Sequence, residues 1–131
     1  MSEHRNRFEL ARQQFLVALA RLQEALVLDE NDIVRDAMIQ RFEFTYELGW
    51  KAMYFWLRDM GENPPKMVRP VLQAALQGHV IDDAGVWEQL KDHRDETSHT
   101  YNAAKAVEVA AFVRSDAIGA FEALADKLST R

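Results

Sequence analysis

This chain of 131 residues, 48% hydrophobic and 28% charged, has the size and composition of a single soluble globular domain. Its formal charge of −5 argues against a protein that coats nucleic acid non-specifically, because that kind of binding depends on many cationic contacts to phosphates. The charge leaves room for one local cationic site and for a basic protein partner.

Cysteine content and hydropathy indicate the cellular compartment. The chain has no cysteine, which excludes a disulfide framework and any thiolate metal site. No apolar run approaches the length that spans a membrane, and the first residues lack the hydrophobic segment of a signal peptide. We therefore expect a cytoplasmic protein that makes no use of a membrane.

Apolar residues recur at steps of three and four, the spacing of amphipathic helices. The first predicted helix covers residues 8–26, and the polar stretch 29–32 then offers several N-caps. The second covers residues 33–60 and stops at Gly61, before Pro64 and Pro65. Aromatic residues widen its apolar stripe beyond one face, which predicts a central place in a bundle or a place at an interface.

Three further helices complete the prediction. A short helix covers residues 66–77 and stops at Gly78, another runs from an N-cap at Asp82 or Asp83 to Arg94, and the last starts after the N-cap Asn102. No repeat, low-complexity segment or interdomain linker interrupts them. The sequence predicts one all-α domain over residues 1–131, an up-and-down four-helix-type bundle with one extra short helix.

The stretch 94–101 combines a strong cation, a group that titrates near neutrality and a phenol: Arg94, His99 and Tyr101. Chance gives about 0.3 Arg-x4-His pairs in such a chain, and about 0.01 once the tyrosine is required. In one continuous helix Arg94 and Tyr101 would share a face while His99 would lie around the cylinder. The three side chains converge only if the helix ends near residues 98–100, or if a second subunit supplies a copy.

The chemistry of such a triplet is that of phosphodiester cleavage. A histidine can take a proton from a ribose 2′-hydroxyl, and an arginine can hold the phosphate and stabilise its developing charge. The pair suffices for RNA cleavage without a metal ion, and we predict neither a metal nor a cofactor. The alternative is a surface Arg94 and a helix-capping His99 with no catalytic role.

The triplet Arg94-x4-His99-x-Tyr101 resembles the signature of the HEPN family, in particular the HepT-type proteins paired with a minimal nucleotidyltransferase. Such chains are also described as nucleotidyltransferase substrate-binding proteins. The resemblance covers roughly residues 8 to 125. Besides the triplet it rests on residues 41–51 (RFEFTYELGWK), on Val86-Trp87, and on residues 97–101 (TSHTY).

The resemblance implies a HEPN-like bundle that forms a homodimer with paired motifs at a common cleft. It implies that Arg94 and His99 are the catalytic residues of an endoribonuclease toxin acting on RNA. It further implies that Tyr101 is the target of AMPylation by a partner nucleotidyltransferase, the antitoxin. A phosphate ester on Tyr101 would add negative charge where the substrate phosphate must bind.

Some features leave alternatives open. The family commonly has asparagine after the arginine, whereas here Asp95 could pair with Arg94 or repel the RNA phosphate. Asp95, Ser98 and His93 are expected to shape the site. A second hypothesis makes the chain a non-catalytic helical subunit that binds a substrate or docks onto a small nucleotidyltransferase. A third makes it a purely structural homodimer.

The block 41–51 is predicted to serve packing or dimer contacts rather than catalysis. Phe42, Tyr46 and Gly49 follow helical steps within it. Glu47 and Lys51, four residues apart, are expected to form an exposed ion pair.

Overall fold

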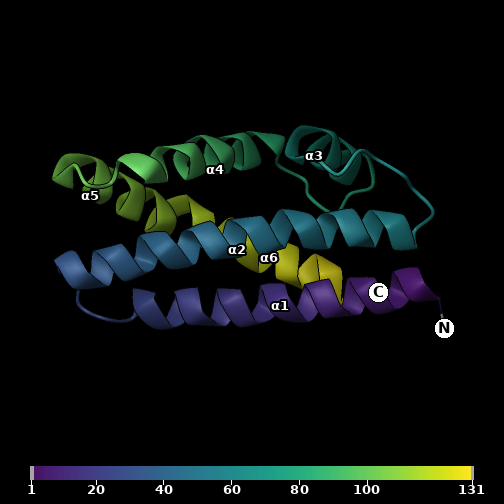
Figure 1. Ribbon diagram of the computed structural model, residues 1–131, viewed down its shortest axis with the longest axis horizontal. Coiled ribbons are helices and arrows are strands. Elements are labelled where there is room, and N and C mark those ends of the chain that lie inside the picture. The colour runs from purple at the N-terminus through teal and green to yellow at the C-terminus, as the bar shows by residue number, and fades with distance from the viewer. Residues whose placement is uncertain (1, 131) are drawn as a thin grey trace.

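The computed structural model describes residues 2–130, which form helices joined by short connections (Figure 1). The predicted all-α fold is confirmed, with no strand between residues 2 and 130. The elements are α1 (Glu3–Leu26), α2 (Asp32–Asp59), α3 (Val68–Gln77), α4 (Ala84–Glu96), the 3-10 turn η1 (Thr97–His99), α5 (Ala103–Phe112), the π-helical segment η2 (Val113–Ala117) and α6 (Ile118–Ser129).

The main helices run roughly parallel to one long axis. Figure 1 shows α1 and α2 as a long antiparallel pair, with α4 beside α2 and the continuous α5–η2–α6 helix crossing behind it. The short α3 lies near the far end of α2. Helix α2 contacts α1, α3, α4, α5 and α6 and is therefore the central helix of the bundle. This confirms the first of the two places that its aromatic residues predicted, the centre of a bundle or an interface. None of the described helices is both long and apolar enough to cross a membrane.

The predicted N-caps explain where the helices begin. The side chains of Asn31, Asp83 and Asn102 accept hydrogen bonds from the backbone N–H groups at the starts of α2, α4 and α5. These bonds satisfy donors that the first helical turn leaves without partners. Gly61 has a φ of 91°, a conformation that a side chain disfavours, and it lies just beyond the end of α2.

Helix α3 begins at Val68, two residues later than predicted. Pro64 and Pro65 favour extended backbone before them, and Met67 is itself extended. The ammonium of Lys66 lies over the rings of two α2 aromatic residues, 5.4 Å and 5.1 Å from their centroids. The connection is therefore packed on α2 before the helix starts.

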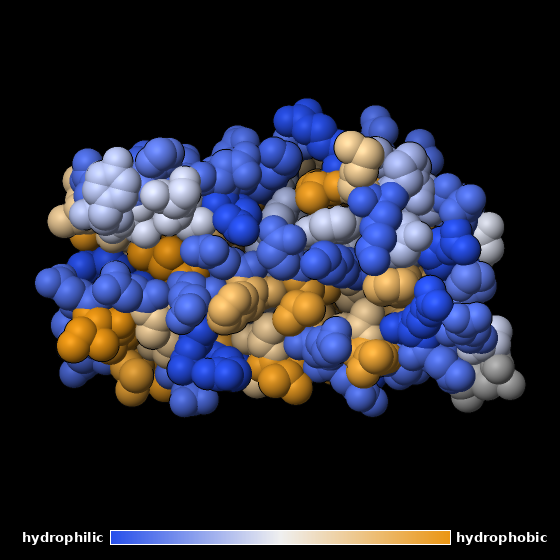
Figure 2. Space-filling model, viewed as in Figure 1, coloured by the Kyte–Doolittle hydropathy of each residue, from blue (hydrophilic) through white to orange (hydrophobic). Residues whose placement is uncertain are grey.

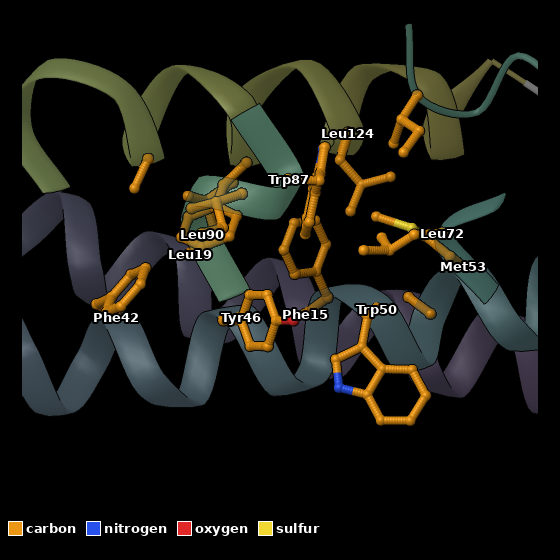
Figure 3. Close-up of a cluster of buried hydrophobic side chains, with 14 of the residues drawn as sticks. Phe15, Leu19, Phe42, Tyr46, Trp50, Met53, Leu72, Trp87, Leu90 and Leu124 are labelled. Atoms are coloured by element: carbon orange, nitrogen blue, oxygen red, sulfur yellow. The ribbon is translucent and has the colours of Figure 1, made fainter. Parts of the chain in front are cut away.

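A cluster of buried aromatic rings forms the centre of the core (Figure 3). The ring of Phe121 lies 6.3 Å from Phe15, 6.1 Å from Phe42 and 5.9 Å from Trp87, centroid to centroid. These contacts join α1, α2, α4 and α6 in one apolar layer. A Cβ on Gly49 would lie 3.1 Å from the Phe15 ring, so this glycine allows α1 to approach α2 closely.

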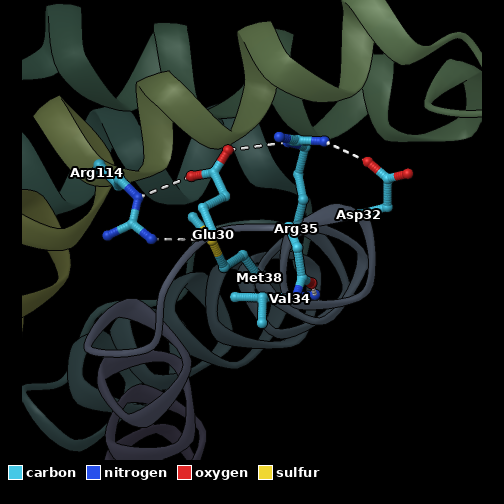
Figure 4. A network of polar contacts seen from close by, with 7 residues as sticks. Glu30, Asp32, Val34, Arg35, Met38 and Arg114 are labelled. Atoms are coloured by element: carbon cyan, nitrogen blue, oxygen red, sulfur yellow. Dashed lines mark hydrogen bonds and ion pairs between the residues drawn. The ribbon is translucent and has the colours of Figure 1, made fainter.

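A polar network fixes the connection between α1 and α2 (Figure 4). Arg114 of η2 donates to a Glu30 carboxylate oxygen over 3.0 Å and to the Leu26 carbonyl oxygen over 2.8 Å. Glu30 also accepts from Arg35 over 2.9 Å. Hydrogen bonds from Arg114 and then from Arg35 lower the pKa of Glu30 below its ordinary value.

Candidate functional site

The candidate site lies where α4 gives way to α5. The predicted helix end is confirmed, since α4 stops at Glu96 and η1 follows. The hydroxyls of Thr97, Ser98 and Thr100 each donate to the backbone carbonyl three residues earlier, over 2.7, 3.3 and 2.9 Å. Such bonds compete with the α-helical pattern, which gives this segment a local reason to leave it.

Arg94 points from α4 towards α2. Its Nε lies 3.3 Å from Glu47 Oε1, and its Nη1 lies 3.8 Å from Glu43 Oε2. Nη1 also donates to Thr97 Oγ1 over 3.2 Å. The Nε–Glu47 contact is an ion pair whose angle is unfavourable for a hydrogen bond. The guanidinium is thus held between two carboxylates and remains about one-third exposed.

Glu47 does not form the predicted pair with Lys51. Its second carboxylate oxygen, Oε2, accepts from Trp50 Nε1 over 3.1 Å. The ammonium of Lys51 instead lies 6.0 Å from the centroid of the Trp50 ring. The prediction was wrong because α4 brings a guanidinium to the same carboxylate, a contact that spacing within one helix does not show.

His99 and Tyr101 lie together on the surface. Their rings meet edge to face, with centroids 6.2 Å apart. Both side chains are exposed, and Tyr101 has 87% of its surface open to solvent. No hydrogen bond or ion pair links Arg94 with His99 or Tyr101 within the described residues. The structure therefore brings two of the three predicted residues into contact and directs the third towards α2.

The Asp95 carboxylate does not contact Arg94. It pairs with Lys91, one turn earlier on α4, at 3.0 Å. Both lie on the outer surface of α4, and Asp95 is exposed. Ser98 is also exposed, and its hydroxyl is occupied by the Asp95 carbonyl oxygen. The prediction that Asp95 could pair with Arg94 is therefore wrong.

His93 packs between α4 and α5. Its ring stacks on Phe112 with centroids 4.0 Å apart and an interplanar angle of 20°. Its Nδ1 is buried and has no hydrogen-bond partner. Close by, Lys105 donates to Glu96 over 2.6 Å, and this bond lowers the pKa of Glu96. These contacts join the two helices on either side of η1.

Two adjoining cavities separate α2 from the segment that carries Tyr101. One, of about 440 Å³, is lined by Asp32, Arg35, Asp36, Thr100, Tyr101, Ala103 and Ala106. The other, of about 330 Å³, is lined by Asp36, Ile39, Gln40, Glu43 and Thr100. They share Asp36 and Thr100, so a hollow leads from Tyr101 to a carboxylate partner of Arg94. Nowhere in residues 2–130 do three metal-ligating side chains gather.

The sequence did not mark Glu43, Glu47 and Thr97 as site residues. Glu43 and Glu47 lie one turn apart and share a face of α2, which was the only available signal. That signal is weak, because paired carboxylates on a helix surface are common. Thr97 gave no signal beyond its tendency to bond to the local backbone.

The fold is that of a class of helical domains that bind substrates of nucleotidyltransferases. A Haemophilus influenzae protein described as a substrate-binding domain of a nucleotidyltransferase is 28% identical, with a TM-score of 0.67 over 94% of this chain and 97% of that one. A protein from Thermus thermophilus is 31% identical, with a TM-score of 0.80 over 88% of this chain and 98% of that one.

The family follows from the sequence match. Residues 10–130 match the family described as nucleotidyltransferase substrate binding protein like, and the chain belongs to that family. It is also similar to a Haemophilus influenzae protein named probable ribonuclease HepT, with 37% identity over 88 residues. That match covers 61% of this chain and 60% of the relative. The predicted resemblance to HepT-type proteins is confirmed.

Proposed function

We propose that this chain is a metal-independent endoribonuclease of the HepT type, the toxin of a toxin–antitoxin pair. The observation that carries the proposal is the exposed His99 ring beside the exposed Tyr101, directly after the helix that carries Arg94. The similarity to a relative named as a ribonuclease supports it. The substrate class is RNA, because the reaction uses the ribose 2′-hydroxyl.

His99 takes the proton of the 2′-hydroxyl, and the 2′ oxygen then attacks the adjacent phosphorus. The bond from phosphorus to the 5′ oxygen breaks, and that oxygen leaves with a proton from the imidazolium or from water. The products are a 2′,3′-cyclic phosphate and a 5′-hydroxyl. Arg94 binds the phosphate and stabilises the charge that builds on its oxygens.

Tyr101 is the control point of this proposal. Its phenol oxygen attacks the α-phosphorus of ATP in the active site of a minimal nucleotidyltransferase, and pyrophosphate leaves. An 87% exposed side chain can enter the active site of another protein without unfolding of its own domain. The added phosphodiester then lies beside His99 and opposes the RNA phosphate by its charge.

A homodimer completes the proposal. A groove of about 600 Å³ between α1 and α2 is lined by apolar side chains, including Leu10, Val17 and Phe44, which are 58%, 62% and 55% exposed. Figure 2 shows apolar residues along this seam. Phe44 and Leu48 directly follow Glu43 and Glu47 on α2, so the groove lies about 100° around this helix from the two carboxylates that face Arg94.

The rival function is a non-catalytic subunit that binds a substrate or docks onto a nucleotidyltransferase. The observation that favours it is the charge around Arg94, because the guanidinium already forms ion pairs with two carboxylates. It keeps the fold and the partner and removes the chemistry from this chain.

Cleavage of a mixed RNA pool in the presence of a chelator decides between the two. The wild-type protein, expressed alone, is compared with His99→Ala and with His4→Ala, an exposed histidine of α1 that serves as the matched control. We expect wild type and His4→Ala to cleave equally and His99→Ala to be slower by about 10²–10⁴-fold. Equal cleavage by all three, or none from unmodified wild type, would exclude the nuclease.

A further inference from the structure

The charges around Arg94 pose a problem for any phosphate that binds there. One guanidinium faces the carboxylates of Glu43 and Glu47, so the three side chains carry one net negative charge. The nearby lysines are engaged, Lys91 with Asp95 and Lys105 with Glu96. If these side chains kept their positions, their net negative charge would repel an entering phosphodiester.

The two carboxylates are held differently. Glu47 uses Oε1 for Arg94 and Oε2 for the indole N–H of Trp50, whose side chain is almost fully buried. Glu43 lies farther from Arg94, at 3.8 Å, beyond hydrogen-bond distance. No hydrogen bond holds the Glu43 carboxylate within residues 2–130, and it borders the cavity that reaches Thr100. Glu43 therefore has both the freedom and the space to move, whereas Glu47 is held at both of its carboxylate oxygens.

The guanidinium itself shows which carboxylate a phosphate would meet. Nε faces Glu47, and Nη1 faces Glu43 and Thr97. Nη2 donates no hydrogen bond to the described part of the chain. A phosphate bound by two parallel N–H groups would use the edge formed by Nη1 and Nη2. That edge is the one Glu43 borders, while Glu47 remains on the opposite side at Nε.

We propose that Glu43 and Glu47 are positioning residues with opposite effects on RNA binding: Glu47 holds the Arg94 guanidinium in place, and Glu43 competes with the RNA phosphate for its Nη1–Nη2 edge. The proposal rests on the proposed function, since it assumes that Arg94 binds the phosphate of RNA. In the free protein Glu43 compensates the Arg94 charge, and it moves into the adjoining cavity when RNA binds.

Replacement by glutamine separates the two roles because it removes charge and keeps the size of the side chain. Glu43→Gln takes away a competitor and leaves the other contacts of Arg94 in place. Glu47→Gln has a different effect, because an amide that accepts from Trp50 through its one oxygen turns its NH2 group, and no longer a carboxylate oxygen, towards the Arg94 guanidinium. Arg94 then loses its fixed orientation, which offsets the gain from the lost charge.

The test measures binding of a fluorescent oligonucleotide that carries 2′-O-methyl riboses and so cannot be cleaved through its 2′ oxygens. Glu24→Gln, an exposed residue of α1 with no ion pair among residues 2–130, controls for the change in net charge. Relative to that control, we expect Glu43→Gln to bind about two- to fivefold more tightly, the strength of a partly exposed ion pair. Glu47→Gln should bind no more tightly than the control, and Arg94→Ala should lose binding.

Cleavage of unmodified RNA gives the second readout. We expect a lower KM at similar kcat for Glu43→Gln, and a kcat about tenfold lower at similar KM for Glu47→Gln. Unchanged or weaker binding by Glu43→Gln, with cleavage still dependent on Arg94 and His99, would overturn this inference and leave the nuclease standing. The expected binding pattern without any cleavage would support the inference and remove the nuclease. Full binding by Arg94→Ala would remove both.

Discussion

Thr97 hydrogen-bonds to Arg94 twice: its hydroxyl donates to the Arg94 carbonyl oxygen over 2.7 Å and accepts from Arg94 Nη1 over 3.2 Å. One buried hydroxyl therefore ends α4 and also directs the guanidinium at that end. The backbone turn and the orientation of the candidate phosphate-binding group depend on the same atom.

Replacement of Thr97 by valine should affect both properties. Valine keeps the shape and removes the hydroxyl, so we expect a loss of about 1 kcal/mol in the free energy of unfolding. If Arg94 binds phosphate as proposed, RNA cleavage should fall about tenfold as the guanidinium loses its orientation. Urea unfolding and cleavage rates measure the two effects. Thr97→Ser, which keeps the hydroxyl, should retain most of both, and equal losses in the two variants would contradict the role of the hydroxyl.

Glycine replacements test the close approach of α1 and α2. In Gly49→Ala the new methyl group meets the buried Phe15 ring at 3.1 Å and a Leu124 methyl at 3.5 Å. Overpacking outweighs the helix propensity gained, so we expect a net loss of about 1 kcal/mol in the free energy of unfolding. Gly119→Ala, on an exposed face with no atom within 4 Å of the new Cβ, should gain about 0.5–1 kcal/mol. Thermal unfolding of both variants checks the opposite signs.

The Glu30 network predicts a pH dependence. The pKa of Glu30 in the folded protein lies below its ordinary value of 4.5, so its contribution to stability is present above that pH and is lost as the pH falls through the folded pKa. Glu30→Gln should be less stable than wild type by about 1 kcal/mol at pH 7. The difference should shrink as urea unfolding is repeated at pH values falling below 4.5. A difference that stays constant over this range would contradict the lowered pKa.

Modification of Tyr101 is measured by intact mass. Coexpression with a partner nucleotidyltransferase should add adenylyl groups to the wild-type chain and abolish its RNA cleavage. The Tyr101→Phe variant should remain unmodified and should still cleave RNA. Tyr54 is a half-buried tyrosine of α2, and the Tyr54→Phe variant should be modified to the same extent as wild type. Modification of Tyr101→Phe to the same extent would place the target elsewhere in the chain.

The proposed dimer is tested at the groove between α1 and α2. A charge at Val17 or Phe44 should oppose burial of the apolar surface against a second copy, so Val17→Glu and Phe44→Glu should sediment as monomers while wild type sediments as a dimer. Val107→Glu introduces the same charge at a 48% exposed apolar residue of α5 and should remain dimeric. A wild-type monomer at all concentrations would contradict the dimer.

Local signals predicted the helices except for the first turn of α1, which begins at Glu3 after the N-cap Ser2 and not at residue 8. Apolar periodicity gave their number and order, and the N-caps Asn31, Asp83 and Asn102 fixed three of their starts, because capping depends on neighbours in sequence. The contacts of Arg94 with Glu43 and Glu47 could not be predicted in this way. They depend on how α4 packs on α2, and packing between distant helices leaves no mark in the spacing of either one.

The sequence did not predict the wide π-helical turn of η2. This turn determines where the C-terminal helix can lose a residue and still direct its apolar side chains to the core. Val113, Ala117 and Phe121 are buried at successive steps of four. On a regular α-helix each such step advances about 40° around the axis, and the i→i+5 turn of a π-helix absorbs this drift.

Loss of exposed Ser115 would therefore return this turn to an ordinary α-helix with the apolar faces on both sides still directed inward. Loss of a residue within α6 would instead rotate everything beyond it by about 100° and turn Leu128 away from the core. The C-terminal helix thus tolerates a change of length at η2 that it would not tolerate one turn later.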